Sequence, residues 1–299
     1  MDPYRRIKSL TMLVTAFWAC IFLTSCAALH GCNSCGLNYT QPYKPPSFTL
    51  IEVSLHLEPA ECVDMATGNS CNNILGMLPP KIVSTRGSGT VVKVVNDQTY
   101  VLTADHVCSH PAKSSFEMPF PGSPGNPPML TRITVNQRTV ISAVDGDGVP
   151  HISSVHATDN INDACLIKSD GAWGEDRVVP VASSMPIVGS RVYNIAAPFG
   201  IFSPGSPGVK LHFEGRYSGS DAAGNYFYTL PARPGSSGSA VLDSRGYIIG
   251  VVHSAMVNFE HVALASSLSS VHALMSTIPE ETHKGHPHQK GAHFFFFGF

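Results

Sequence analysis

The sequence predicts an all-β fold. Its apolar runs are short, often rich in valine, isoleucine and threonine, and separated by turn residues along most of the 299-residue chain. Glycine (26 residues) and proline (23 residues) are plentiful, and both mark turns. Charged residues make up only 13% of the chain, against about 25% in an average domain. The net charge of −2 lacks the basic excess of a nucleic-acid-binding protein, so we expect no nucleic-acid partner.

Residues 1–26 are predicted to be a targeting segment that lies outside the fold. Basic residues at positions 5, 6 and 8 precede an uncharged apolar run from Ser9 to Thr24. Small residues then lead to Cys26, which resembles the lipidated cysteine of a bacterial lipoprotein signal. A plain secretory signal and an uncleaved membrane anchor stay as alternatives, since the run approaches the ~20 residues that span a bilayer. All three predict export, secreted or periplasmic, and we favour membrane attachment.

Residues 27–79 are predicted to be a cysteine-containing tether and N-terminal extension. Residues 41–46 (Gln-Pro-Tyr-Lys-Pro-Pro) favour an extended chain. Cys32 and Cys35 have the spacing of a redox or zinc motif, but without a second ligand pair nearby a disulfide is the better interpretation. Cys62 and Cys71 bracket a short polar segment and predict a disulfide-closed loop, as suits an exported chain.

A regular strand pattern begins near Lys81 and divides at a polar link around residues 170–187. Strands are expected at residues 87–95, 99–104, 132–135, 138–144, 151–157, 163–167, 188–195, 210–217 and 226–230, with a hairpin at 241–252. The proline- and glycine-rich stretch from His110 to Pro128 is expected to be a long exposed loop. The one convincing helix runs from Ser266 to Met275.

Residues 276–299 differ from the rest of the chain and are expected to form a disordered tail. Four spaced histidines precede a terminal run of phenylalanines. Spaced histidines bind metal only weakly without an ordered frame, so we expect no metal site and no cofactor. Membrane insertion, packing on the body of the protein and contact with a partner are alternative roles for the phenylalanines.

The stretch Pro234-Gly-Ser-Ser-Gly-Ser-Ala240 is the strongest candidate for chemistry. Glycine on both sides allows a sharp bend and a close approach of substrate. Ser237 on such a turn can present its hydroxyl to a carbonyl, while its own N–H and that of Gly235 point at the oxyanion that forms. Alone, the turn is weak grounds for catalysis, because glycine- and serine-rich turns are common.

Two residues earlier in the chain supply the rest of a nucleophilic serine site. His106 ends a predicted strand hairpin, and Asp163 opens a predicted strand. A serine hydroxyl needs a histidine to take its proton and a carboxylate to orient that histidine. The order histidine, aspartate, serine along the chain is one of the few orders found for this chemistry.

With these residues in place, the chain resembles a trypsin-like serine endopeptidase of the chymotrypsin fold. Residues 103–106 (Thr-Ala-Asp-His), 162–167 (Asn-Asp-Ala-Cys-Leu-Ile) and 235–240 (Gly-Ser-Ser-Gly-Ser-Ala) resemble the family's three motifs, in order. Residues 189–195 with 198–200 are similar to the opening of the second barrel in bacterial Deg-type proteases. The resemblance covers residues 80–275, and no PDZ-like domain is expected after them.

The resemblance implies a fold and a set of roles. We expect two six-stranded antiparallel β-barrels, over about residues 80–175 and 186–275, with a short C-terminal helix. Ser237 would be the nucleophile, His106 the general base and then acid, and Asp163 the orienting carboxylate. The N–H groups of Gly235 and Ser237 would form the oxyanion hole. Protein or peptide would be the substrate.

Departures from the family pattern bear on activation and specificity. Ser236 stands where mammalian zymogens place the aspartate that binds a freed N-terminus, so we expect no such activation. Pro231 stands where trypsins place the aspartate that holds basic side chains. His253 is expected either to bond Asp163 or to line the substrate pocket with Pro231 and Ala255. A preference for small or apolar side chains is the default.

Two further cysteines follow the candidate residues at equal distances. Cys108 lies two residues after His106, and Cys165 lies two residues after Asp163. If the histidine and the aspartate come together in space, these cysteines can pair as well. The alternative is two buried thiols.

An exported serine endopeptidase is the leading hypothesis for function. A non-catalytic binding module on a protease fold is the first alternative, although such relatives commonly lose one residue of the three. The second alternative is a membrane-tethered attachment protein, whose cysteine-rich start and tail would meet partners. Oligomeric state is not indicated by the sequence.

Overall fold

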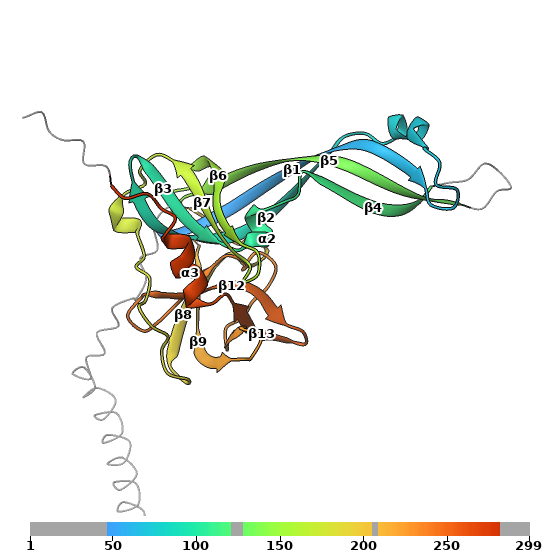
Figure 1. Cartoon of the computed structure of the whole chain (residues 1–299). Coiled ribbons are helices and arrows are strands. Elements are labelled where there is room, and N and C mark those ends of the chain that lie inside the picture. The colour runs from blue at the N-terminus through green and yellow to red at the C-terminus, as the bar shows by residue number, and fades with distance from the viewer. Residues whose placement is uncertain (1–46, 121–127, 205–208, 282–299) are drawn as a thin grey trace, which may run out of the picture. The chain divides into compact units, whose positions relative to one another are not determined.

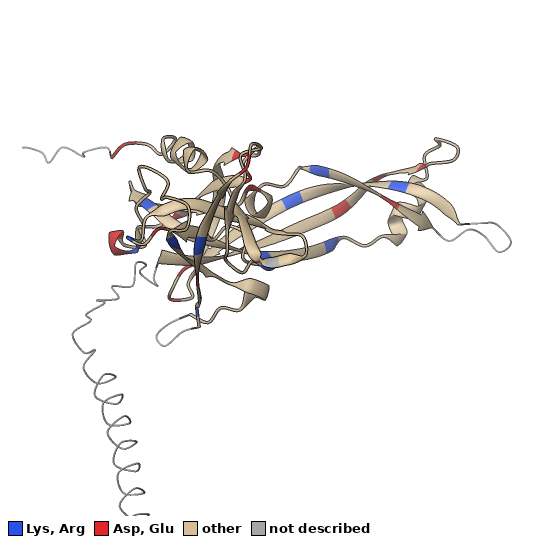
Figure 2. Ribbon diagram, turned by 90° about the horizontal axis from the view of Figure 1, so that it is seen from below, with Lys and Arg blue, Asp and Glu red and all other residues tan. Residues whose placement is uncertain are grey.

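A computed structural model describes residues 47–120, 128–204 and 209–281 of the chain (Figure 1). The predicted targeting segment with Cys26, the Cys32–Cys35 pair and the tail after residue 281 lie outside the described residues. Within the described ranges, no helix has both the length and the apolar character needed to cross a bilayer. The positions of basic and acidic residues are spread over the strands and turns of this part of the protein (Figure 2).

Six antiparallel strands close the first barrel. Their order is β1-β2-β3-β7-β6-β5, and pairing of β1 with β5 completes the circle. A seventh strand, β4, joins the outer edge of β5. The bounds of the strands are β1 (Phe48–Asp64), β2 (Lys81–Val95), β3 (Gln98–Thr103), β4 (Lys113–Phe120), β5 (Met129–Val144), β6 (Pro150–Asp159) and β7 (Ala164–Asp170).

The first barrel begins at β1 and not near residue 80, where the sequence pattern placed its start. Residues 48–57 pair with β2 along ten consecutive positions, and β1 also pairs with β5 from Leu50 to Asp64. Phe48, Ile51 and Val53 are buried in the barrel cores. The segment assigned to a tether therefore contains a structural strand, because β1 pairs with β2 on one edge and β5 on the other and buries its apolar side chains.

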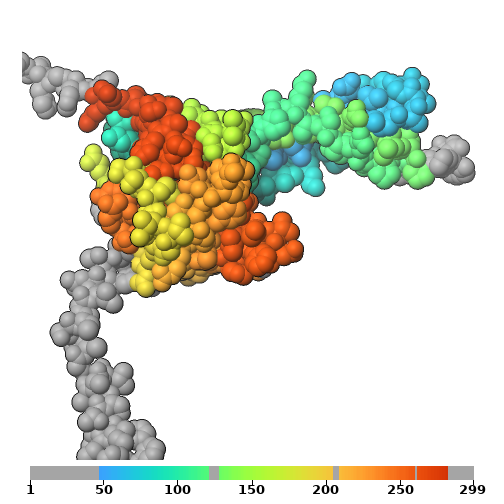
Figure 3. Space-filling view, turned by 60° about the horizontal axis from the view of Figure 1, so that its bottom comes forward, coloured from blue at the N-terminus to red at the C-terminus, as the bar shows by residue number. Residues whose placement is uncertain are grey.

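Three strands of this barrel are long and continue beyond it into an arm. β1, β2 and β5 extend past the barrel, and β4 pairs with the far part of β5 (Figure 1). The 3-10 helix η3 (Asn72–Met77) and the Cys62–Cys71 disulfide, which the sequence predicted, close the arm's loop over a small apolar cluster. The space-filling view shows the arm standing clear of the barrels (Figure 3).

The arm corrects two sequence expectations. The predicted exposed loop from His110 to Pro128 contains strand β4, and the two strands expected in residues 132–144 are one continuous strand, β5. Along β4, Phe116, Met118 and Phe120 alternate with Ser115, Glu117 and Pro119, and Met118 and Phe120 pack against the apolar cluster of the arm. Such alternation is typical of a half-buried strand, but the prolines and glycines in and after this run favoured a loop in the sequence interpretation.

Six more antiparallel strands close the second barrel, which confirms the prediction of two six-stranded barrels. Their order is β10-β13-β12-β11-β8-β9 around the circle. The sequence did not predict β13. The bounds are β8 (Arg191–Ala196), β9 (Leu211–Ser220), β10 (Tyr226–Tyr228), β11 (Ala240–Leu242), β12 (Ile248–Met256) and β13 (Phe259–Ala265). The predicted C-terminal helix is α3 (Leu268–Met275), which begins with a hydrogen bond from the Ser270 N–H to the Ser267 hydroxyl.

The two barrels share an apolar cluster. Leu102 and Leu166 of the first barrel meet Ile195 and Leu242 of the second within one group of buried side chains, and Val271 of α3 joins them. Burial of this kind stabilises by roughly 25 cal/mol for each Å² of apolar surface removed from water. The packing fixes the boundary between the barrels, along which the candidate residues lie.

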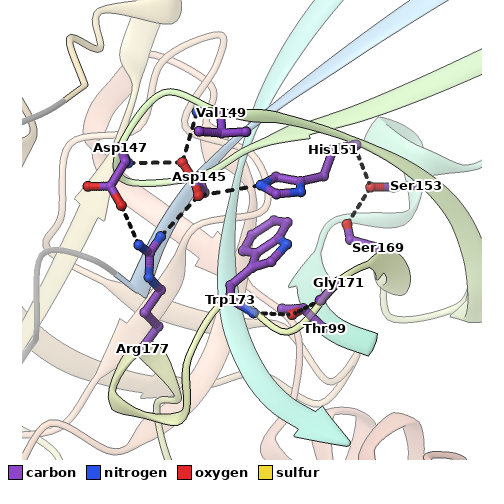
Figure 4. Close-up of polar contacts among 10 residues, drawn as sticks. All are labelled: Thr99, Asp145, Asp147, Val149, His151, Ser153, Ser169, Gly171, Trp173 and Arg177. Atoms are coloured by element: carbon purple, nitrogen blue, oxygen red, sulfur yellow. Dashed lines mark hydrogen bonds and ion pairs between the residues drawn. The ribbon is translucent and has the colours of Figure 1, made fainter. Parts of the chain in front are cut away.

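A polar network attaches the link between the barrels, at residues 173–177, to the β5–β6 turn of barrel one (Figure 4). Arg177, in the short helix η4 (Glu175–Arg177), pairs with Asp145 at 3.2 Å and also with Asp147. Asp145 accepts the backbone N–H groups of Asp147 and Val149 in the β5–β6 turn. The Trp173 ring lies 4.5 Å from the His151 ring, measured between centroids.

Candidate active site

Three turns bring the candidate residues to the boundary between the barrels. His106 lies in α2 (Asp105–Cys108), a single helical turn that directly follows β3. Asp163 ends the turn between β6 and β7, and Ser237 lies in the turn between β10 and β11. The sequence places each of them next to a strand end, because strands of a barrel hold their connecting turns in fixed positions.

His106 and Asp163 are joined at two points. The His106 ring Nδ1 lies 2.7 Å from Asp163 Oδ2, and the His106 backbone N–H donates to Oδ1 at 3.0 Å. Both carboxylate oxygens are therefore engaged by one residue. With Nδ1 bound to the carboxylate, Nε2 is the ring atom left to accept a proton. The structure thus brings together two of the three residues that the sequence singled out.

The pair is electrostatically coupled. The hydrogen bond to Asp163 raises the pKa of His106 above its ordinary value of 6.5, although partial burial acts in the opposite direction. Burial would raise the pKa of Asp163, but the hydrogen bonds from His106 outweigh it and lower that pKa. Asp163 is consequently an anion at neutral pH, and its charge favours the imidazolium form of His106.

A disulfide ties the same two segments together. Cys108, at the end of α2, is bonded to Cys165, near the start of β7. The conditional prediction of this pair is confirmed, since the histidine and the aspartate do meet. Both sulfur-bearing side chains are buried, in the cluster that also holds Val107.

Among the described residues, no hydrogen bond joins Ser237 to His106 in this arrangement. Its hydroxyl donates instead to the backbone carbonyl of His253 at 3.4 Å, a long hydrogen bond. A serine hydroxyl turns about one bond between staggered positions, so a weak contact of this kind does not lock it. Contacts between a nucleophile and its base are often long or absent before substrate binds.

The peptide groups beside Ser237 are held in a defined orientation. The Pro234 carbonyl accepts the Phe199 N–H at 2.6 Å, and the Ser236 carbonyl accepts the Ser239 N–H and hydroxyl. Carbonyl and N–H point in opposite directions across a trans peptide. The N–H groups of Gly235 and Ser237 therefore point away from these contacts, and neither donates to an acceptor among the described residues.

Gly235 has a backbone conformation that this orientation requires. Its φ is +95°, a region that side chains other than glycine rarely adopt. A Cβ at this position would also overlap the Ala197 carbonyl oxygen. Two free N–H groups close to a serine hydroxyl form a site for a developing negative charge.

Sequence reasoning missed Ser88, which holds this turn from the other barrel. Its N–H donates to the Ser237 carbonyl at 2.7 Å, and its hydroxyl donates to the Gly235 carbonyl at 2.8 Å. The same hydroxyl accepts the Ala197 N–H at 3.0 Å. Its only sequence signal is the run Gly87-Ser-Gly89, where small residues permit a close approach; the contact itself joins residues far apart in the chain.

Comparison with models of protein families identifies the family of the chain. The trypsin-like peptidase domain matches residues 87–251, more than half of the chain, and the match includes His106, Asp163 and Ser237. The chain belongs to the trypsin-like peptidase family.

Two solved protease structures are similar to this trypsin-like peptidase. The serine endoprotease from Yersinia pestis has 16% identity and a TM-score of 0.49, over 78% of this chain and 62% of that one. The chain thus spans less than two thirds of the Yersinia pestis protein. The Rv3671c protease from M. tuberculosis, in its active form, has 16% identity and a TM-score of 0.47, over 80% of this chain and 84% of that one. No curated protein sequence matches.

A pocket of about 320 Å³ opens beside Ser237 in this trypsin-like peptidase. Besides Ser237 it is lined by Ala232, Arg233, Pro234, Ser236, Val252, Ser254 and Ala255. Of the expected pocket residues, Ala255 lines it, whereas Pro231 and His253 are not among the lining residues. The His253 ring meets the Ser254 hydroxyl at 3.0 Å, and chiefly its burial lowers the His253 pKa.

A second pocket of about 320 Å³ lies on the other side of the serine turn. Gly235 and Pro234 form one wall, and Ser84, Arg86, Phe199 and Gly200 form the rest. Arg86 is held by an ion pair with Glu52 at 2.9 Å. Both pockets thus border the Gly235–Ser237 segment, since Ser237 lines the first, Gly235 lines the second and Pro234 lines both.

Proposed function

We propose that this trypsin-like peptidase is an exported serine endopeptidase. Ser237 is the nucleophile, His106 the general base and then acid, and Asp163 the carboxylate that orients His106. The N–H groups of Gly235 and Ser237 hold the oxyanion. The observation that carries the proposal is the two-point hydrogen bonding between His106 and Asp163, beside a serine turn with two unpaired N–H groups.

The proposed reaction has two halves. The Ser237 hydroxyl attacks the peptide carbonyl carbon while His106 Nε2 takes its proton, and the carbonyl oxygen becomes an oxyanion bound by the two N–H groups. His106 then gives the proton to the leaving amine as the C–N bond breaks, which leaves an acyl ester on Ser237. Water, deprotonated by His106, attacks this ester and releases the carboxylic acid and the free serine.

The recesses on both sides of the serine turn support cleavage within a chain. Substrate residues before the scissile bond would occupy the pocket that Ala255 lines, and residues after it would occupy the pocket beside Phe199. The first pocket combines alanine, valine and serine side chains with the exposed Arg233. We propose small or apolar side chains as its preferred occupants, since no acidic group lines it to pair with a basic one.

Two disulfides among the described residues support the proposal of export. Disulfides persist in oxidising compartments such as the periplasm or the extracellular space. Together with the apolar N-terminal run and Cys26 in the sequence, they favour a secreted or membrane-attached protein.

A serine-directed fluorophosphonate tests the proposed activity. The purified chain and its Ser237→Ala variant are treated with the reagent and compared by intact mass. A single adduct on the wild type alone is expected, because only an activated Ser237 with its oxyanion hole reacts. A folded wild type that takes up no adduct would contradict the proposal and favour a non-catalytic binding module.

A further inference from the structure

Two different bonds join the same two segments over the same stretch of chain. His106 and Asp163 are 57 residues apart in the sequence, and so are Cys108 and Cys165. One pair is linked by hydrogen bonds at the site, and the other by a disulfide in the barrel interior. The disulfide thus joins the same two segments as the hydrogen-bonded pair, and each cysteine lies two positions after a residue of that pair.

The segment that carries His106 has little structure of its own. α2 is a helix of four residues, and a helix this short is not stable by itself in water. The backbone bonds around it, from the Val107 N–H to the Ala104 carbonyl and from the Ser109 N–H to the Asp105 carbonyl, stay within the segment. Its attachment to β7 therefore depends on packing, on the His106–Asp163 contact and on the disulfide.

The other segment is also in an unfavourable conformation. Asp163 has a φ of +50°, which residues other than glycine adopt at an energetic cost that surrounding structure must offset. The residues that follow it, Ala164 and Cys165, are fully buried. A covalent bond at Cys165 fixes the chain two residues beyond the strained position and so restricts how Asp163 can relax.

We propose that the Cys108–Cys165 disulfide is a positioning element of the active site. It holds α2 against β7, so that His106 keeps both hydrogen bonds to the carboxylate of Asp163. The cysteines do not touch the reacting atoms and act through these two residues. The inference rests on the proposed function, because it assigns the disulfide to the same site.

The second disulfide of the described chain provides a matched control. Cys62–Cys71 closes a short loop of the arm and lies in a separate apolar cluster with Ile74, Ile133 and Val135. Both disulfides are buried. Removal of either one subtracts a cross-link, but only Cys108–Cys165 joins the segments of His106 and Asp163.

The experiment compares the double variant C108A/C165A with C62A/C71A and the wild type. Thermal unfolding and near-ultraviolet circular dichroism report the fold, and the rate of fluorophosphonate labelling reports the site. The titration of the His106 ring is followed by NMR. Because Asp163 raises the His106 pKa, a loosened contact should lower it toward its ordinary value. Asp105 and His253 also face this ring electrostatically and stay in place in both variants.

We expect C108A/C165A to fold, to label at least about tenfold more slowly and to show a lowered His106 pKa. C62A/C71A should keep the wild-type labelling rate and His106 pKa. The proposal is overturned if C108A/C165A labels and titrates like the wild type. It is also overturned if both variants lose activity equally, which would indicate a general effect of cross-linking.

A second variant covers the possibility that alanine leaves a cavity too large for folding. C108A/C165V restores much of the lost volume without a bond between the segments. If this variant also fails to fold while C62A/C71A folds, the disulfide serves the fold as a whole and the positioning role is rejected.

The titration of His106 can be measured whether or not the protein hydrolyses a substrate. A wild type that takes up no label, yet whose His106 pKa depends on the disulfide, would reject the proposed function and keep the inference.

Discussion

Ser88 of barrel one and Ser237 of barrel two are joined by a hydrogen bond of 2.7 Å from the Ser88 N–H to the Ser237 carbonyl. The Ser88 hydroxyl adds bonds to the Gly235 carbonyl and the Ala197 N–H. The Ser88 side chain therefore connects β2 of barrel one to two segments of barrel two, the serine turn and the residue that follows β8. The direction of the Gly235 and Ser237 N–H groups depends on this support from outside their own barrel.

Ser88→Ala should weaken both the fold and the site. The substitution leaves the buried Ala197 N–H unpaired, which should lower the free energy of unfolding by about 1–3 kcal/mol. Looser Gly235 geometry should reduce hydrolysis by about tenfold or more. Urea unfolding and kcat/KM on a peptide substrate measure the two effects.

Thr49→Val is the matched control for Ser88→Ala. Thr49 lies in β1 opposite Gly89, and its buried hydroxyl has no hydrogen-bond partner among the described residues. Removing this hydroxyl should leave stability and activity close to those of the wild type. Equal losses in the two variants would show that the Ser88 bonds have no special role.

The sequence predicted those parts of the site that lie in short local motifs. His106, Asp163 and Ser237 each stand at a strand end within a recognisable run of residues. Cys62–Cys71 was predicted from its short spacing, and Cys108–Cys165 only on the condition that His106 and Asp163 meet. Ser88 was missed because its role consists of contacts to residues more than a hundred positions away. A serine between two glycines has no local feature that distinguishes this role from an ordinary turn.

The fold was predicted best where strands are buried on one face. β1 shows such a pattern, since Ile51, Val53, Leu55 and Leu57 alternate with polar residues, but its composition was grouped with the proline-rich stretch before it. β4 also alternates, with Phe116, Met118 and Phe120 between polar residues and a proline, but it was grouped with the proline- and glycine-rich stretch after it. In both strands the alternation is present, but neighbouring prolines and glycines, which mark turns and loops, outweighed it in the interpretation.

Asp163→Asn tests the coupling of the histidine to its carboxylate. Neutral His106 is needed to take the serine proton, so kcat/KM of the wild type should rise with pH through a pKa above 6.5. Loss of the anion removes the group that favours imidazolium, which should lower the His106 pKa toward its ordinary value. The rate should fall by about 10⁴-fold, as when such a carboxylate is neutralised in the general serine-protease scheme.

The pH profile of an Asp159→Asn variant separates a local from a general charge effect. Asp159 lies on the same turn, but its carboxylate bonds to Ser270 and Asn162 and not to His106. We expect the apparent pKa of kcat/KM to stay near the wild-type value. A shift as large as that of Asp163→Asn would indicate that net charge, and not the direct contact, sets the titration.

Gly235→Ala should disable the oxyanion hole. A Cβ here would overlap the Ala197 carbonyl oxygen, and alanine does not favour a φ of +95°. The peptide must rotate, which turns the Gly235 N–H away from the oxyanion, and hydrolysis should fall by about 10²–10³-fold. Gly224→Ala is the control, since Gly224 has a similar φ of +87° but open space around it. If both substitutions reduce kcat equally, backbone strain alone would explain the loss.

Ala255→Leu should narrow the pocket beside Ser237. The pocket of about 320 Å³ loses volume to the larger side chain, so peptides with a bulky residue before the scissile bond should lose kcat/KM. Peptides with alanine or glycine there should keep most of their rate, because their side chains do not need the lost volume. A single methylene in a pocket is worth roughly 1–3 kcal/mol of discrimination. Labelling by a small fluorophosphonate should not change. An unaltered preference across the peptide series would place the specificity pocket elsewhere.

Asp145 should make the attachment of the inter-barrel link sensitive to acid (Figure 4). Burial would raise its pKa, but hydrogen bonds from the Val149 N–H and His151, with the charge of Arg177, lower it on balance. A carboxyl whose pKa is lowered by folding stabilises the native state above its unfolded pKa. That contribution disappears as the pH falls through the lowered value. Asp145→Asn should therefore reduce the free energy of unfolding at pH 7, and should flatten its decline below about pH 4.

Asp147→Asn provides the comparison that isolates this effect. Asp147 also pairs with Arg177, but its side chain is 66% exposed, whereas that of Asp145 is 8% exposed. An exposed ion pair contributes only about 0–1 kcal/mol, because water screens it. Urea unfolding measured from pH 3 to pH 7 should thus follow the wild-type curve for Asp147→Asn and depart from it for Asp145→Asn. Since this network lies at the far end of barrel one, fluorophosphonate labelling at pH 7 should be the same in both variants. Slower labelling of Asp145→Asn alone would mean that loosening the link also changes the positions of the active-site residues at the boundary between the barrels.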